Sequence, residues 1–77
     1  MKIKVIVTLK KGVLDPQGKA IQQTLNGMSF SNIKEVRQGK YFDIEVNLDD
    51  EKKAKASVEE MCKKLLANLV IEDYKIL

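Results

Sequence analysis

The sequence lacks histidine and tryptophan, and it contains one cysteine, Cys62, and one proline, Pro16. Without histidine, the chain has neither the commonest general base nor the commonest metal ligand. One cysteine can form neither an internal disulfide bond nor a metal site with the usual Cys/His spacing. These absences exclude zinc sites of the Cys/His type and argue against acid–base catalysis that depends on histidine.

Long apolar segments and phosphate-binding loops are also missing. No apolar run approaches the roughly 20 residues needed to cross a bilayer, and we find no secretory signal. Cys62 lies among apolar residues at helical spacing, so we expect its side chain to be buried. A single cysteine without a secretory signal predicts a reducing, cytoplasmic compartment. The four glycines do not fall into either common phosphate-binding spacing; they are Gly12, Gly18, Gly27 and Gly39.

Charged residues of both signs are plentiful. The 14 Lys and Arg residues and 11 Asp and Glu residues give a net charge of +3, and Arg37 is the only arginine. The charges are interspersed, whereas nucleic-acid binding favours a basic face. Base stacking needs several aromatic side chains on one face, and only Tyr41 and Tyr74 are candidates. RNA binding is therefore disfavoured.

A chain of 77 residues is long enough for one domain, and we assign residues 1–77 to a single domain. A domain of this size buries only about 60% of the surface that its unfolded chain exposes. Because no disulfide can strengthen so small a core, association with another chain is the expected source of extra stability. The sequence thus predicts a homodimer or a higher homo-oligomer.

The first half of the chain predicts a strand, a helix and a second strand. Apolar residues alternate over residues 2–9, as in a strand with one face on a core. Asp15 can cap a helix that begins at Pro16 and continues to about residue 26. Gly27 is placed to close that helix in a left-handed conformation. A second strand is expected over residues 30–36.

The second half repeats this order. Gln38-Gly39 predicts a tight reversal, followed by a strand over residues 41–48 in which Phe42 faces the core and Tyr41 faces away. Asp49 and Asp50 can cap a second helix, Asn68 can end it, and a last strand follows over residues 70–77. The expected fold is an α+β, β-α-β-β-α-β two-layer sandwich with two similar halves, its antiparallel sheet covered by helices on one face as in ferredoxin-like folds.

The carboxylates do not form an obvious acid–base pair. Asp49, Asp50 and Glu51 stand at a helix start, where they suit capping and the helix dipole. Glu72 and Asp73 alternate across a strand and cannot converge on one substrate atom.

Gly18 is unusual because it lies in the first turn of a helix, where it costs about 1 kcal/mol relative to alanine. Either close backbone packing within the chain or close approach of a partner chain would explain it.

Three segments carry a resemblance to a known family: Leu14-Asp15-Pro16-Gln17-Gly18, Val36-Arg37-Gln38-Gly39-Lys40 and the stretch from Leu66 to Tyr74. Their order and spacing resemble PurS, the small subunit of bacterial phosphoribosylformylglycinamidine synthase, over nearly the whole chain. One departure is Leu69, which stands where the family usually has proline. Asn68 must therefore do more of the work of ending the preceding helix.

The resemblance implies a non-catalytic subunit that joins a glutaminase, PurQ, to an ATP-dependent synthetase, PurL. The family's complex converts formylglycinamide ribonucleotide, glutamine and ATP into formylglycinamidine ribonucleotide, glutamate, ADP and phosphate. A bridging subunit would align the two active sites and help to seal the path of ammonia between them. ATP and magnesium would be used by the assembled complex, and this chain would hold no cofactor and no metal.

Two expectations about binding follow. Arg37 is the only side chain that can make a planar, bidentate contact with a carboxylate, and it lies with Lys40 and Tyr41 on the predicted hairpin. The expected partner surface consists of Asp15, Gln17, Arg37, Lys40 and Tyr41. The alternative is a free-standing regulatory module that binds a small ligand, for which the chain offers only Asp15, Gln17 and Gly18 as a loop with polar groups.

Overall fold

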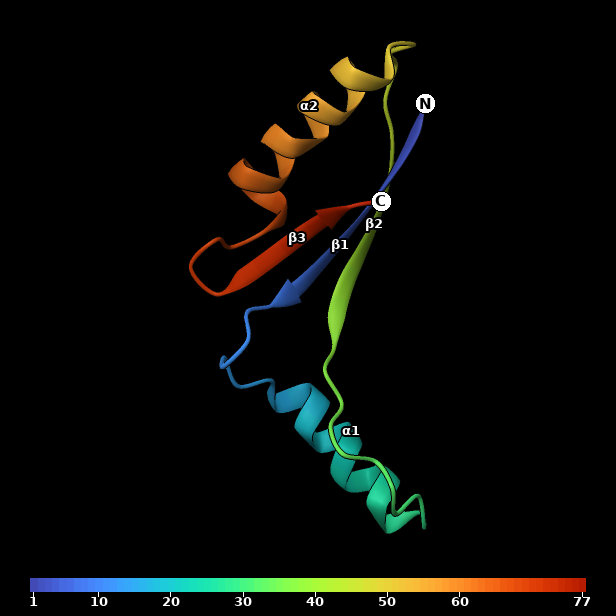
Figure 1. The fold of residues 1–77 in the computed structure, drawn as a ribbon, viewed down its shortest axis with the longest axis vertical. Helices are drawn as coiled ribbons and strands as arrows, with labels where there is room; N and C mark the ends of the chain where they lie inside the picture. The colour runs from blue at the N-terminus through green and yellow to red at the C-terminus, as the bar shows by residue number, and fades with distance from the viewer.

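The computed structural model describes residues 1–77 as a three-stranded antiparallel sheet with two helices (Figure 1). The strand order is β2-β1-β3, so the first strand lies in the centre. The predicted α+β class with an antiparallel sheet is confirmed. In chain order the elements are β1 (Lys2–Leu9), α1 (Pro16–Gly27), β2 (Gly39–Glu45), α2 (Glu51–Met61), a π-helical turn η1 (Cys62–Leu66) and β3 (Glu72–Ile76).

The core lies between one face of the sheet and α2. Val5 stands opposite Phe42 on β2 and Ile76 on β3, so apolar side chains from all three strands share that face. The alternation predicted for the first strand is confirmed, and Cys62 is buried as expected. Burial raises the pKa of the Cys62 thiol. The buried apolar residues are Ile3, Val5, Val7, Ala54, Val58, Cys62 and Ala67.

The second helix begins where the sequence predicts, and its π-helical continuation η1 ends at Leu66, before the predicted stop at Asn68. The Asp50 side chain accepts hydrogen bonds from the backbone amides of Lys52 and Lys53. Asn68 follows η1 and turns the chain, because its side-chain oxygen accepts from the Val70 amide at 3.1 Å and its backbone oxygen accepts from the Glu72 amide at 2.7 Å. The helical turns themselves end at Leu66 with Ala67 as the extended C-cap residue, so Asn68 forms the turn just after the helix and does not cap it.

The first helix begins as expected but ends differently. Asp15 caps it by accepting a hydrogen bond from the Gly18 amide, and Pro16 is its first residue. The prediction that Gly27 closes the helix in a left-handed conformation is wrong. Gly27 is still helical, and Ser29 takes the left-handed conformation with a φ of 75°. The Met28 amide continues to bond the carbonyls of the last turn, which moves the stop beyond Gly27.

Residues 30–38 form neither the predicted strand nor the predicted reversal. The chain passes straight through Gln38-Gly39 into β2. Gly39 is already paired with Thr8 in the sheet, and the Gln38 amide donates to the carboxylate of Asp15. The bonds of Gln38 and Gly39 therefore keep the chain from reversing its direction here, as a hairpin would require. The sequence predicts four strands covered by two helices. The structure of one chain has three strands covered by α2 alone, and α1 lies beyond the end of the sheet.

The molecule accordingly has two parts (Figure 1). We call residues 1–9 and 39–77 the body, residues 16–36 the arm, and the two connecting segments, residues 10–15 and 37–38, the waist. The molecule measures 49 × 24 × 14 Å with a radius of gyration of 16.0 Å. A compact chain of this length would have about 11–12 Å. The arm therefore extends from the body instead of packing on it.

The arm leaves apolar side chains uncovered. Ile21, Met28 and Phe30 are 42%, 62% and 50% exposed, and Gly18 is the only buried residue of α1. On the body, α2 contacts β1 and also β3, where the Tyr74 hydroxyl donates to Glu59. Phe42 on β2 is only partly buried. Apolar surface thus remains open on both parts.

Gly18, in the first turn of α1, lies against the backbone of Val36 at the other end of the arm. A Cβ atom on this residue would overlap the carbonyl oxygen of Val36, and the Asp15 carboxylate is also close. Of the two explanations left open by the sequence, the structure supports close backbone packing within the chain. No side chain larger than hydrogen fits there without a shift of the backbone.

We predict that Gly18→Ala lowers the free energy of unfolding by about 1–3 kcal/mol, the usual cost of forcing extra atoms into a packed site. Gly27→Ala is the matched control, because a Cβ atom there would meet no other atom within 4 Å. That control should be neutral or stabilising by up to about 1 kcal/mol. Urea unfolding followed by circular dichroism measures both changes, and equal stability of the two variants would contradict the assigned packing.

Candidate functional site

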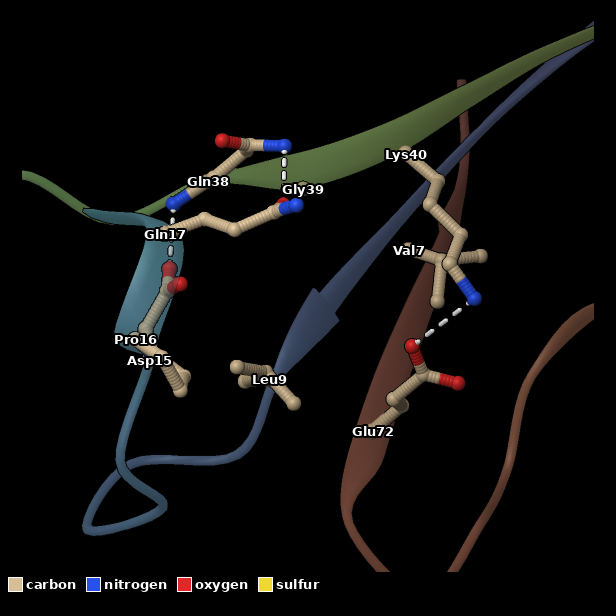
Figure 2. Close-up of a pocket in the computed structure, with 9 residues that line it drawn as sticks. All are labelled: Val7, Leu9, Asp15, Pro16, Gln17, Gln38, Gly39, Lys40 and Glu72. Atoms are coloured by element: carbon tan, nitrogen blue, oxygen red, sulfur yellow. Dashed lines mark hydrogen bonds and ion pairs between the residues drawn. The ribbon is translucent and has the colours of Figure 1, made fainter. Parts of the chain in front are cut away.

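A hollow of about 260 Å³ lies between the start of α1 and the end of the sheet (Figure 2). Its floor is apolar and comes from β1, and its polar side chains come from the waist, α1, β2 and β3. We call it the sheet-end hollow. Its lining residues are Val7, Leu9, Asp15, Pro16, Gln17, Gln38, Gly39, Lys40 and Glu72.

Asp15 ties the start of α1 to the segment that enters β2. One carboxylate oxygen accepts from the Gly18 amide at 2.9 Å and the other accepts from the Gln38 amide at 2.6 Å. These backbone donors, first that of Gln38 and then that of Gly18, hold the pKa of Asp15 below its usual value. Both oxygens of this buried residue are thus engaged within the chain.

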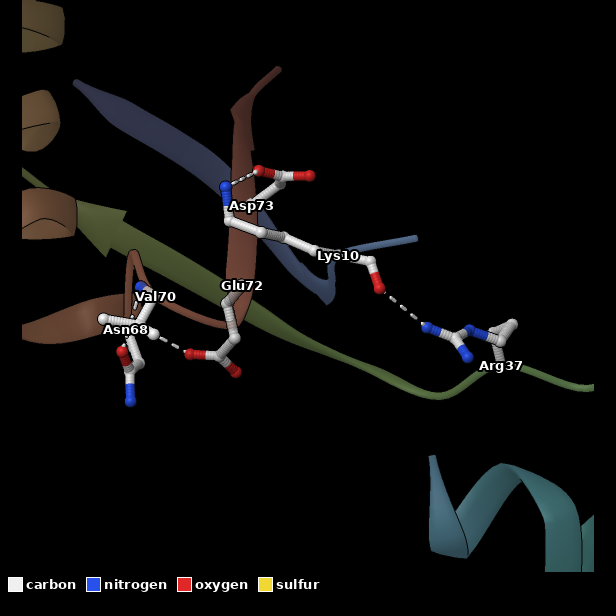
Figure 3. A network of polar contacts seen from close by, with 6 residues as sticks. All are labelled: Lys10, Arg37, Asn68, Val70, Glu72 and Asp73. Carbon is white, nitrogen blue, oxygen red and sulfur yellow. Dashed lines mark hydrogen bonds and ion pairs between the residues drawn. The ribbon is translucent and has the colours of Figure 1, made fainter. Parts of the chain in front are cut away.

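Glu72 has a similar arrangement on the opposite wall of the hollow. Its carboxylate accepts from the Asn68 amide at 2.7 Å and pairs with the Lys40 ammonium group at 3.3 Å. The Asn68 amide is the main cause of its lowered pKa, and Lys40 adds to the effect. Asp73 points to the other face of the sheet and pairs with Lys10 (Figure 3). The predicted divergence of these two adjacent carboxylates is confirmed.

Arg37 is directed toward the waist. One terminal nitrogen donates to the Val13 carbonyl at 2.8 Å and the other donates to the Lys10 carbonyl at 3.2 Å. Figure 3 shows the second of these bonds, next to the Lys10–Asp73 ion pair. The predicted partner role of Arg37 rests on its planar guanidinium group. In the structure both terminal nitrogens of this group form hydrogen bonds within the chain, and these bonds hold the loop that follows β1.

The five residues expected at a partner surface fall into three places. Asp15, Gln17 and Lys40 line the sheet-end hollow, and Arg37 lies at the waist. Tyr41 is exposed on the outer face of the sheet, where it stands opposite Ile6. Phe42 faces the core, so the predicted opposition of these two adjacent aromatic side chains is confirmed. Whether the five residues contact a partner stays a prediction.

Two residues of the site were not anticipated from the sequence, namely Gln38 and Glu72. Gln38 was assigned to a turn, although its amide bonds Asp15 and its side chain donates to the Gln17 side chain at 2.7 Å. Glu72 was considered only in relation to Asp73. The one available signal was the spacing from Asn68 to Glu72, which suits a side chain that closes a short loop.

The charged side chains of the hollow are bonded to groups of the same chain. Each carboxylate accepts backbone hydrogen bonds, and the Lys40 charge is paired with Glu72. No nucleophile stands beside a base there. No cluster of three potential metal-ligating side chains occurs in the structure.

No helix has both the length and the apolar character needed to span a bilayer.

Comparison with known proteins gives one consistent result. The family model "PurS: Phosphoribosylformylglycinamidine (FGAM) synthase" matches residues 2–77. The PurS subunit of Methanocaldococcus jannaschii is 56% identical over 75 residues, covering 97% of this chain and 90% of the relative. The PurS subunit of Bacillus subtilis is 49% identical over 74 residues, covering 96% and 87%.

Solved structures agree with these relatives. The crystal structure of M. jannaschii PurS matches with a TM-score of 0.88 and 55% identity, covering 99% of this chain and 92% of that one. A chain from the structure of PurLQS from Thermotoga maritima matches with a TM-score of 0.90 and 32% identity, covering 99% and 93%. The fold is thus shared, over almost the whole chain, with experimentally determined structures.

The two hydrogen-bonded carboxylates predict how stability depends on pH. Because their pKa values are lowered by folding, their contribution is complete above the ordinary carboxyl pKa of about 4 and is lost as pH falls through the lower folded values. The free energy of unfolding should therefore fall below about pH 4. In Asp15→Asn this fall should be shallower. Asp43→Asn, which changes an exposed carboxylate, should keep the original slope. Urea titrations at several pH values between neutral and acidic measure the free energy of unfolding of each variant. Equal slopes against pH for the two variants would refute the lowered pKa assigned to Asp15.

Proposed function

The chain belongs to the PurS family of phosphoribosylformylglycinamidine synthase subunits, and from this premise we propose that it serves as the non-catalytic subunit that joins the PurQ glutaminase to the PurL synthetase in purine biosynthesis. The observation that carries the proposal is the match to a chain of the PurLQS structure, which extends over almost the whole length of both chains. The chain is thereby a subunit of a ligase.

The polar groups of the chain support a role without catalysis. Asp15 and Glu72, its most buried carboxylates, are committed to backbone amides and cannot exchange protons with a substrate without loss of those bonds. ATP, magnesium and glutamine would therefore be handled by the two larger subunits. The proposed contribution of this chain is alignment of their active sites, so that ammonia passes between them without release to solvent.

The open apolar surfaces support a homodimer as the unit that enters the complex. The β2 edge of the sheet has no neighbouring strand, and residues 33–38, which follow a turn at Ser31 and Asn32, belong to no strand. If the arm of one copy lay along β2 of a second copy, α1 would cover Phe42 and its apolar neighbours on the sheet. Each body would gain the fourth strand and second helix that the sequence pattern predicts.

The partner surface is proposed on the residues whose polar ends are accessible. Tyr41 and Lys40 are exposed at the start of β2, and Gln17 is exposed on the first turn of α1. Asp15 and Arg37 would act behind this surface by holding the waist in place.

The functional prediction is a difference between two nitrogen sources. Added to PurL and PurQ, the chain should restore glutamine-dependent synthesis, while ammonia-dependent synthesis by PurL should change little. The chain alone should neither hydrolyse glutamine nor consume ATP. Steady-state assays with each subunit omitted in turn measure these rates. Full glutamine-dependent activity without this chain, or turnover by the chain alone, would overturn the proposal.

The structural prediction concerns the homodimer. Ile21→Glu on the exposed face of α1 should shift the protein toward monomer, because the substitution places a charge in the proposed contact. Leu65→Glu is the control, since Leu65 is an exposed leucine on η1, outside the arm. Light scattering at micromolar concentration, about the range of ordinary assembly, measures the mass of each variant. An unaffected mass for Ile21→Glu, or a stable monomer in the parent protein, would contradict the proposed contact.

A further inference from the structure

The two segments of the waist, residues 10–15 and 37–38, join the arm to the body. Hydrogen bonds connect these two segments to each other. Both terminal nitrogens of Arg37, in the second segment, bond to carbonyls of Lys10 and Val13 in the first. The Gln38 amide bonds to Asp15, again from the second segment to the first. Just beyond the waist, the side chains of Gln17 and Gln38 add a fourth bond at 2.7 Å.

This bonding restricts the direction of the arm. A single connecting segment could pivot, because a few φ/ψ changes at one hinge are enough to swing an element. With two segments, both must bend together, and here they are cross-linked by hydrogen bonds. Gly12, with a φ of 91°, already places a turn in the first segment, and Arg37 holds that turn through the Lys10 and Val13 carbonyls.

A folded-back arm is the natural competing conformation. The sequence pattern of Gln38-Gly39 favours a tight reversal, which would return residues 30–36 along the edge of β2 in the same chain. Such a reversal would redirect the Gln38 amide away from the Asp15 carboxylate and carry Arg37 away from the loop at Lys10. The closed chain would bury its apolar surfaces alone, whereas the observed chain leaves them exposed. The inference rests on the proposed homodimer, in which a second copy covers them.

We propose that the waist bonds form a conformational lock that holds the arm extended, and so determine whether the arm covers its own body or the body of another copy. Asp15 and Arg37 are the positioning residues of this lock. Asp15 has a second duty as the cap of α1, whereas Arg37 has none. The two residues can therefore be tested by different substitutions.

The main variant is Asp15→Asn. Asparagine caps helices as well as aspartate does, so the bond from the Gly18 amide can persist. Its amide group, however, offers only one acceptor oxygen, and the Gln38 amide then faces a donor. Arg37→Gln is the second variant, because it removes the bonds to Lys10 and Val13 and leaves the cap untouched. Asp50→Asn makes the same chemical change at the cap of α2, where no bond crosses between segments.

Size-exclusion chromatography with small-angle X-ray scattering gives the mass and radius of gyration of each variant. We expect Asp15→Asn and Arg37→Gln to release a compact monomer with a radius of about 11–12 Å, against 16.0 Å for the extended chain. At protein concentrations high enough to keep a dimeric fraction, mixing labelled and unlabelled protein should also show subunit exchange about tenfold faster than in the parent protein, as expected for loss of one or two hydrogen bonds. Asp50→Asn should behave as the parent protein does.

Three outcomes would overturn the lock. Both waist variants could keep the parental mass, shape and exchange rate, in which case the bonds do not set the arm. Both could give monomers that remain extended, which would show that the arm has no folded-back alternative. Both could lose their helical circular dichroism while Asp50→Asn keeps it, which would reduce the bonds to ordinary stabilisation. None of these readouts uses enzymatic activity, so they leave the proposed function to be judged separately.

Discussion

The carboxylate of Asp15 is the interaction on which the architecture of this protein depends. It accepts from the Gly18 amide, which starts α1, and from the Gln38 amide, which leads into β2. A carboxylate that accepts two backbone amides forms strong, charge-assisted bonds. The same residue therefore starts the arm and fixes it to the chain that enters the sheet. Arg37 reinforces this junction from the other side of the waist.

Because the arm extends away from the body, the chain is suited to assembly with other chains and has little buried core to stabilise it as a monomer. Its buried core is small and consists mainly of three valines, an isoleucine and two alanines around Cys62. The arm contributes no residue to that core, and it leaves Ile21, Met28 and Phe30 exposed. A small domain with so little burial gains stability by covering such surface with other chains. Membership of a family of complex subunits agrees with this physical requirement.

The local patterns were predictable because their causes lie close together in the sequence. The alternation of residues 2–9, the caps at Asp15 and Asp50 and the turn at Asn68 depend on neighbours within a few residues, and the structure contains all of them. The outward direction of Tyr41 follows from the same two-residue period. The resemblance to PurS added the family, which these patterns alone could not give.

The direction of the arm was not predictable because it depends on contacts between distant residues. Gln38-Gly39 has the composition of a reversal, but the Asp15 carboxylate, 23 positions earlier, holds it extended. The pairing of Glu72 with Lys40 across the sheet-end hollow was missed for the same reason. Gly18 gave a partial signal, because a glycine in the first turn of a helix indicates a close backbone contact but does not identify the segment that makes it. Its neighbour is Val36, which only the folded chain brings near.

The most direct test of this account is to observe the bond between Asp15 and Gln38 in the intact protein. In isotope-labelled protein, NMR can detect scalar coupling across a hydrogen bond, here between the amide nitrogen of Gln38 and the carboxylate carbon of Asp15. The account predicts this coupling at neutral pH, together with slow hydrogen exchange of the Gln38 amide although its residue is exposed. Absence of the coupling, with the Gln38 amide exchanging as fast as an unbonded one, would contradict it.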